Sequence, residues 1–488
     1  MAGRIGLFLG PILFLLIQLF LDVEGLSVEG RSVLASTAWM AAWWITEAVP
    51  IAVTSLLPIV LFPLTGALAA DETTKSYGHY IVFLFLGGFM LAMAFERWNL
   101  HRRVALMTIL YIGGNKRLII LGAMLATALL SMWISNTATS VMMLPIAIAI
   151  ARQFQDDPTT ELDENSQFGK AMMLAIAYSA SIGGMASLIG TPVNLILVGQ
   201  AQEVFGVEIG FIDWLKVGLP TASLLLVYAW FYLTRIAFSF GAGQLPGGNA
   251  QVRSMLAELG PISREEVLVL IVFTLTALSW IFRKAVLSLF VPGINDAVIA
   301  IAAGTVLFLL PARSEDGPRT LLTWQEAVRL PWGVVLLMGG GFALAAGFGS
   351  SGLADFLGGA LSVPESVGIF VVVLIVVAVV NFLTEITSNV ATTSMLLPVL
   401  AAAAIPLGVH PFLLMVPATL AATCAFMLPV ATPPNAVVFG SGYLTIPDMV
   451  RAGLRLNLIS ILLIAVICYL LLPSLWGFVA TELPAWVE

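Results

Sequence analysis

Residues 386–447 form a stretch of 62 residues that contains no Asp, Glu, Lys or Arg. One membrane span needs roughly 20 apolar residues, so this stretch must turn back or break inside a membrane. The whole chain of 488 residues is 60% hydrophobic and only 10% charged, whereas soluble domains carry about 25% charged residues. The sequence therefore predicts an all-α polytopic membrane protein, with the lipid bilayer as its surroundings.

Uncharged apolar runs predict the individual spans. They lie near 5–22, 33–48, 50–68, 79–96, 213–234, 264–282, 295–311, 331–350 and 449–475. The longer regions 118–151, 171–202 and 386–447 must be subdivided. If 118–151 and 366–407 are re-entrant hairpins, about eleven crossings result. Placing the N-terminus in the cytoplasm and the C-terminus outside leaves most of the 21 Lys and Arg residues in cytoplasmic loops, as the positive-inside rule requires.

A polar motif interrupts the apolar region 118–151. Residues 135–145 read SNTATSVMMLP, and residues 388–398 read SNVATTSMLLP, which is identical at seven of eleven positions. Two further pairs follow in the same order: GTPVN (190–194) with ATPPN (431–435), and DWLKVG (213–218) with DMVRAG (448–453). Three matches in one order indicate an internal duplication. Because each half would hold an odd number of crossings, the two repeats are expected to be inverted.

The duplication predicts the domain organisation. We expect a first transmembrane helix in 1–30, inverted repeat 1 in 31–240, a cytoplasmic linker in 241–263 and inverted repeat 2 in 264–488. Repeat 1 would contain the re-entrant hairpin 118–151 and a broken helix in 171–202. Repeat 2 would contain the hairpin 366–407 and a broken helix in 411–442.

Broken helices at matching positions of inverted repeats are typical of a transporter site near the membrane midplane. Helix N-termini at such breaks favour anions, and free carbonyls favour cations. Asn and hydroxyl oxygens can bind Na⁺, whereas Asn amide hydrogens and Thr hydroxyls can bind a carboxylate. An enzyme would need a nucleophile–base or metal cluster, and the predicted spans contain none. The two cysteines, Cys424 and Cys468, lie in apolar runs, and the net charge of −7 gives no basis for nucleic-acid binding.

With these motifs the chain resembles the divalent anion–sodium symporter family, particularly its bacterial dicarboxylate transporters. The shared motifs are ITEAVPIAVTSLLP (45–58), MWISNTATS (132–140), GTPVN (190–194), NFLTEITSNVATTSMLLP (381–398) and ATPPN (431–435). The resemblance covers essentially the whole chain. It implies eleven spans, two re-entrant hairpins, a homodimer in the bacterial inner membrane, and a hairpin domain that moves like an elevator.

The resemblance also implies site residues. One sodium site would use Ser131, Ser135, Asn136 and the Gly190 carbonyl, and the other would use Thr384, Asn389 and the carbonyls of Thr387 and Ala431. Substrate carboxylates would meet Asn136, Thr137, Asn389, Thr432 and Pro433. Val390 stands where some bacterial members have Thr, and its side chain cannot donate a hydrogen bond.

The expected function is sodium-coupled symport of C4-dicarboxylates such as succinate, malate and fumarate, with sodium as the coupling ion and no cofactor. Two alternatives remain open: a sodium-independent dicarboxylate exchanger, and a sodium-coupled transporter of citrate or sulfate on the same fold. Glu385 is an intramembrane carboxylate, and such a group is a functional candidate. A structural hydrogen-bonding role and proton coupling are its two main interpretations.

Overall fold

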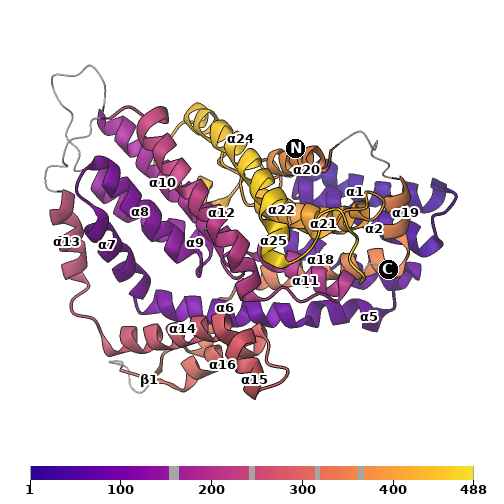
Figure 1. Ribbon diagram of the computed structural model, residues 1–488, viewed down its shortest axis with the longest axis horizontal. Helices are drawn as coiled ribbons and strands as arrows, with labels where there is room; N and C mark the ends of the chain where they lie inside the picture. The colour runs from indigo at the N-terminus through magenta and orange to yellow at the C-terminus, as the bar shows by residue number, and fades with distance from the viewer. Residues whose placement is uncertain (1, 153–163, 241–247, 314–318, 361–367, 487–488) are drawn as a thin grey trace.

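The computed structural model describes residues 2–152, 164–240, 248–313, 319–360 and 368–486 (Figure 1). Its regular structure is almost entirely α-helical, because a helix satisfies every backbone N–H and C=O within its own segment and so tolerates lipid. Strands β1 (Pro311–Ala312) and β2 (Arg319–Thr320) form a short antiparallel pair that the sequence did not predict.

Six helical stretches among the described residues are long and apolar enough to cross a membrane. They are α1 (Ala2–Phe20), α5 and α6 (Ala70–Lys75 and Tyr80–Arg97), α12 (Phe211–Tyr232), α14 (Arg264–Phe282), α18 (Trp332–Ser350) and α24 (Ile446–Leu470). Short π-helical turns, η2 (Leu233–Ala237) and η3 (Arg283–Leu287), extend α12 and α14. Helix α2 (Val28–Thr46) also lies in a predicted span, whereas 50–68 is divided into α3 (Ile51–Thr54) and α4 (Leu57–Thr65).

The predicted hairpins and broken helices each consist of two helices. They are α8 (Lys116–Ser131) with α9 (Asn136–Ala151), α10 (Glu164–Ala186) with α11 (Pro192–Phe205), α20 (Ile369–Leu383) with α21 (Asn389–Ala404), and α22 (Phe412–Ala422) with α23 (Pro433–Phe439). Pro192 and Pro433 each open a half-helix, where a missing N–H costs nothing. The polar motifs therefore mark the interruptions.

The predicted linker 241–263 contains a helix that the sequence did not predict. Residues 241–247 lie outside the described part of the chain, as do 361–367, which include the first two residues of the predicted hairpin 366–407. Residues Gly248–Glu258 form helix α13. This helix forms for a local reason. Residues 251–258, QVRSMLAE, include several good helix formers and contain neither Gly nor Pro. Helix α16 (Asp296–Leu309) is a shorter apolar helix in the predicted span 295–311. Other connecting helices are η1 (Ser76–Gly78), α7 (Leu100–Ile112), α15 (Ser288–Phe290), α17 (Trp324–Ala327), α19 (Leu353–Ala360) and α25 (Leu472–Trp476).

Helices α10 and α22 lie at the centre of the buried core. Helix α10 packs against α8, α9, α12 and α23, while α22 packs against α20, α21, α24 and α11 (Figure 1). All residues of α22 are buried. By contrast, α1 presents Phe8 and Phe20, which are 67% and 76% exposed, as expected for a helix that faces lipid.

The third sequence pair packs in the same way in both halves. Gly218 of α12 lies against the end of α10, where an added Cβ would be 2.6 Å from the Met185 carbonyl oxygen. Gly453 of α24 lies against the interruption after α22, where a Cβ would overlap the Phe426 carbonyl group. Two long helices thus approach the two interruptions at matching glycines.

Candidate functional site

The first hairpin tip brings three oxygen atoms together. Ser131 ends α8 and Asn136 begins α9. The Ser131 Oγ lies 2.8 Å from Asn136 Oδ1 and 2.6 Å from the carbonyl oxygen of Ala180 in α10. A hydroxyl has a single hydrogen, so it can satisfy only one of these two acceptors at a time. Ser135 caps α9, its Oγ accepting from the Ala138 N–H at 3.3 Å.

The second hairpin tip repeats this arrangement. The Thr384 Oγ1 lies 2.7 Å from Asn389 Oδ1 and 3.0 Å from the carbonyl oxygen of Ala422 in α22. Ser131 and Thr384 are both 0% exposed. Each half therefore holds a buried cluster of three oxygens that share one hydroxyl hydrogen. We call these the first and second oxygen clusters.

Glycines let the interruption after α10 approach the first oxygen cluster. A Cβ at Gly190 would lie 2.5 Å from the Gly184 carbonyl oxygen and 2.9 Å from the Ser131 carbonyl oxygen. A Cβ at Gly184 would overlap the amide of Asn136. Only glycine fits at these two positions, so the loop and the hairpin tip are in direct backbone contact.

A cavity of about 920 Å³ lies between the two tips and the two interruptions. All site residues predicted from the sequence line it, except Ser131 and Thr384, whose hydroxyls lie within hydrogen-bond distance of Asn136 and Asn389. The lining residues from that prediction are Ser135, Asn136, Thr137, Gly190, Thr387, Asn389, Val390, Ala431, Thr432 and Pro433. The structure thus brings residues that are up to 298 positions apart (Ser135 to Pro433) to one cavity.

Helix N-termini supply the positive potential of this cavity. Asn136 begins α9, Pro192 begins α11 and Asn389 begins α21; these helices are 14 to 16 residues long, and all three residues line the cavity. Within the described chain, the cavity lining includes no Lys or Arg, and Glu47 is its one charged side chain. The positive charge that faces the cavity therefore comes from the partial charges of helix N-termini and not from cationic side chains.

Three segments that line the cavity were not predicted from the sequence. They are Trp44–Glu47 at the end of α2, Phe85 and Phe89 of α6, and Pro331 and Val334 at the start of α18. Most are apolar or aromatic side chains, which carry no chemical signal of a polar site. The one available signal was the ITEAVP motif, in which Glu47 is the left-handed C-cap of α2.

Glu385 is a structural acceptor in this molecule. Its Oε1 accepts from the N–H groups of Phe426 and Met427 at 2.7 and 2.9 Å, and from the Asn457 amide at 2.7 Å. Its Oε2 accepts from the N–H groups of Met427 and Leu428 at 3.2 and 3.1 Å. The carboxylate thus satisfies the unwound backbone after α22, which favours the structural interpretation over proton coupling.

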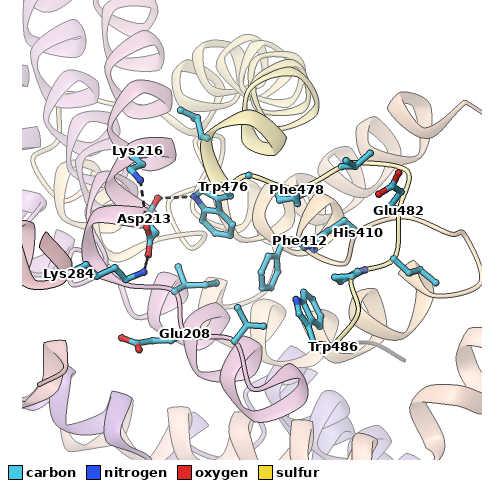
Figure 2. A pocket seen from close by; sticks show the side chains of 17 residues that line it. Glu208, Asp213, Lys216, Lys284, His410, Phe412, Trp476, Phe478, Glu482 and Trp486 are labelled. Atoms are coloured by element: carbon cyan, nitrogen blue, oxygen red, sulfur yellow. Dashed lines mark hydrogen bonds and ion pairs between the residues drawn. The ribbon is translucent and has the colours of Figure 1, made fainter. Parts of the chain in front are cut away.

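A second cavity, of about 590 Å³, contains none of the predicted site residues. Figure 2 shows Asp213 between Lys216 and Lys284, with His410, Phe412 and Trp486 grouped across the cavity. Lys284 lies 2.5 Å from the Asp213 carboxylate, so its charge is paired. Burial lowers the pKa of His410 to about 4, and its ring stacks on Phe478 at 3.9 Å. With His410 neutral, and with three carboxylates (Glu208, Asp213 and Glu482) against two lysines in its lining, this cavity is a poorer anion site than the one between the hairpin tips.

Comparison with known proteins decides the family. A family model described as the sodium:sulfate symporter transmembrane region matches residues 4–478. The chain belongs to this family. Members of the family are transporters, so the chain is a membrane transporter and not an enzyme.

Relatives in this family match along nearly their whole length. The sodium-dependent dicarboxylate transporter SdcS of Staphylococcus saprophyticus is 47% identical over 482 residues, covering 98% of this chain and 93% of that protein. SdcS of Staphylococcus aureus strain USA300 is 47% identical over 481 residues, covering 98% and 92%.

Solved structures of more distant transporters share the fold. Neisseria gonorrhoeae MtrF, described as one of a class of antimetabolite efflux pumps, matches with a TM-score of 0.59 and 11% identity over 99% of this chain and 97% of its own. Alcanivorax borkumensis YdaH matches with a TM-score of 0.53 and 15% identity over 83% and 88%. At these identities the likeness concerns the fold alone.

Proposed function

We propose that this protein is a secondary active transporter that couples sodium to the import of C4-dicarboxylates such as succinate, malate and fumarate. The observation that carries the proposal is the pairing of two oxygen clusters with one cavity lined by helix N-termini. The name of its 47% identical relatives, sodium-dependent dicarboxylate transporter, supports the same substrate and coupling ion.

The cavity supports an anionic substrate. Each helix N-terminus offers roughly half a positive charge, and α9, α11 and α21 begin at residues that line the cavity. Substrate carboxylates would be bound by Asn136, Thr137, Asn389, Thr432 and Pro433, with Val390 providing an apolar contact. The Thr432 Oγ1 accepts from the Asn435 N–H at 3.3 Å, so its own hydrogen remains for a carboxylate.

The oxygen clusters support two sodium sites. Hard cations bind oxygen ligands, and broken helices of transporters bind Na⁺ through side-chain and unwound-backbone oxygens. The first site would consist of Ser131, Ser135, Asn136 and the Gly190 carbonyl. The second would consist of Thr384, Asn389 and the carbonyls of Thr387 and Ala431.

The remaining architecture is part of the proposal. It comprises eleven spans in two inverted repeats, with the domain boundaries stated above, and an elevator motion of the hairpins and broken helices. A homodimer in the bacterial inner membrane, with the N-terminus in the cytoplasm and the C-terminus outside, completes it. Three features support the repeats: the matched oxygen clusters, the matched interruptions, and the matched glycine contacts at Gly218 and Gly453.

The competing functions use the same cavity. An exchanger would need the anion site without sodium, and the family description itself names sulfate. Initial rates of labelled succinate uptake into proteoliposomes, in sodium and in choline buffer, test the proposal. We expect uptake only in sodium. Equal rates in both buffers would instead favour the exchanger, and competition by sulfate but not by malate would favour a sulfate carrier.

A further inference from the structure

Two asparagines of the GTPVN and ATPPN motifs, Asn194 and Asn435, do not line the cavity, yet both are 0% exposed. Each is the third residue of the half-helix after an interruption. The Asn194 Nδ2 donates to the carbonyl oxygens of Gly184 and Ser187 at 3.1 and 2.7 Å. The Asn435 Nδ2 donates to those of Ala425 and Leu428 at 3.1 and 3.0 Å. The spacing, ten and seven residues back, is the same in both halves.

These amides close the two interruptions. Helix α10 ends at Ala186, so the Gly184 and Ser187 carbonyls are among those that lack a partner within the helix. Ala425 and Leu428 lie in the unwound segment between α22 and α23. In each half the amide therefore holds the end of one half-helix to the start of the next.

In each half, one of the residues whose carbonyl accepts from the asparagine, Ser187 or Leu428, also contacts the hairpin tip next to the oxygen cluster. Ser187 donates its Oγ hydrogen to the Met132 carbonyl, and the Leu428 N–H donates to Glu385 Oε2 at 3.1 Å. Met132 and Glu385 directly follow the hydroxyl residues of the two clusters. The two halves thus use different groups to make the same connection.

The same carbonyls position the backbone that would complete each cation site. Gly190 lies against the Gly184 carbonyl, which Asn194 binds. The Ala431 N–H donates at 3.2 Å to the Leu428 carbonyl, which Asn435 binds. Removing the amide would break both of its bonds to these carbonyls and loosen the loop that carries Gly190 or Ala431.

The amide donors come at an energetic cost. Within the described part of the chain, neither Asn194 Oδ1 nor Asn435 Oδ1 has a hydrogen-bond partner, although both are buried. An unpaired buried acceptor is unfavourable. An unpaired amide oxygen occurs at both matching positions. This indicates that each asparagine is needed for its two N–H donors, which bind the carbonyls of the interruption.

We propose that Asn194 and Asn435 are positioning residues for the two cation sites, each holding its interruption so that Gly190 or Ala431 faces the adjacent oxygen cluster. This inference rests on the proposed sodium-coupled function. It assigns the two asparagines a role in sodium affinity without contact with sodium or substrate.

The test uses Asn194→Asp and Asn435→Asp in the full chain. Asp keeps the shape but retains at most one donor, and only when protonated. Initial succinate uptake is measured against sodium concentration, and thermal unfolding of the purified variants is measured with and without sodium. Gln200→Leu is the matched control, because Gln200 is another 0% exposed amide, bonded to the Ser394 carbonyl at 3.3 Å and with an unpaired oxygen.

We expect each Asp variant to raise the half-saturating sodium concentration by roughly five- to tenfold. Sodium should also stabilise these variants less than the wild type, while Gln200→Leu keeps the wild-type sodium response. Asn194→Ser and Asn435→Ser each retain one donor, so their half-saturating sodium concentrations should be intermediate. They serve as the test if an Asp variant does not fold. Folded variants with wild-type sodium affinity would overturn this inference. Wild-type uptake that does not need sodium would instead overturn the proposed function.

Discussion

Ser131 and Thr384 occupy the same position in the two oxygen clusters, and their hydroxyls set the contact between each hairpin tip and the central helix beside it. Each hydroxyl oxygen lies within 3.0 Å of an amide oxygen and a backbone carbonyl oxygen. Three oxygens around one hydrogen leave lone pairs unmatched, and this arrangement is the basis of the proposed cation sites.

Removing either hydroxyl should therefore weaken sodium binding first. For Ser131→Ala and Thr384→Ala we expect the half-saturating sodium concentration to rise about tenfold, on the scale of one lost hydrogen-bonding group. The KM for succinate at saturating sodium should change much less, because substrate affinity then falls only through linkage. Sodium titrations of uptake measure both quantities. Thr384→Ser keeps the hydroxyl and is the control. If Thr384→Ser had a sodium affinity as low as that of Thr384→Ala, the hydroxyl would not be a sodium ligand.

Asn136 and Asn389 would contact both proposed ligands, since each amide lies in an oxygen cluster and also lines the cavity. We expect Asn136→Ala or Asn389→Ala to lower succinate uptake by at least on the order of 100-fold, because two lost contacts of about 1.5–3 kcal/mol each to charged groups sum to about 3–6 kcal/mol. Size-exclusion profiles should remain those of the wild type. Near-normal uptake by either folded variant would show that the amides are not part of the site.

At the scale of elements, the interrupted helices depend on close packing by their neighbours. Helix α24 touches the interruption after α22 through Gly453, and its Asn457 donates to Glu385, whose carboxylate accepts from the same stretch of backbone. A Cβ at Gly453 meets backbone, which cannot rotate away. The geometry of the proposed second cation site therefore rests on a contact made by a different helix.

Gly453→Ala should accordingly destabilise the protein by about 1–3 kcal/mol, the usual cost of overpacking, and lower its thermal unfolding temperature. Gly349→Ala in α18 is the matched control, because a Cβ there meets no atom within 4 Å. That variant should be neutral or slightly more stable, since Ala favours helix. Equal unfolding temperatures for the two variants would show that α24 can move away from the interruption without cost.

The sequence predicted the hairpin tips and interruptions but not the contacts between distant segments, and the difference has a physical reason. Polar motifs inside uncharged runs identified the hairpin tips and interruptions, because such groups are tolerated in a membrane only where structure surrounds them. Contacts between distant segments left no local signal: Ser131 meets Ala180, and Glu385 meets Asn457. The helix in the predicted linker was missed because adjacent Gly and Pro residues dominated the interpretation of 241–263.

At the scale of the whole molecule, the site must balance the charge of its substrate without Lys or Arg in the described cavity lining, whose one charged side chain is the acidic Glu47. Two bound sodium ions would neutralise a dianion, and helix N-termini would add partial charges of roughly one half each. A trianion would retain excess charge in a region of low dielectric constant, which is unfavourable.

Citrate should therefore compete poorly with succinate once it is fully ionised. We expect citrate to inhibit succinate uptake weakly in mildly alkaline buffer and more strongly in mildly acidic buffer, where one carboxyl group is protonated. Inhibition by malate, a dianion throughout this range, serves as the control. Strong inhibition by citrate in alkaline buffer would mean that the space and apolar surface at Val390 matter more than charge.

The central claim is that sodium and a dicarboxylate are carried together through the cavity between the two hairpin tips. Its most direct test is uphill accumulation of labelled succinate in proteoliposomes under an inward sodium gradient, with equal succinate on both sides at the start. The proposal predicts net accumulation that collapses when the sodium gradient is dissipated. Labelled succinate that only equilibrates, at the same rate with or without sodium, would contradict it.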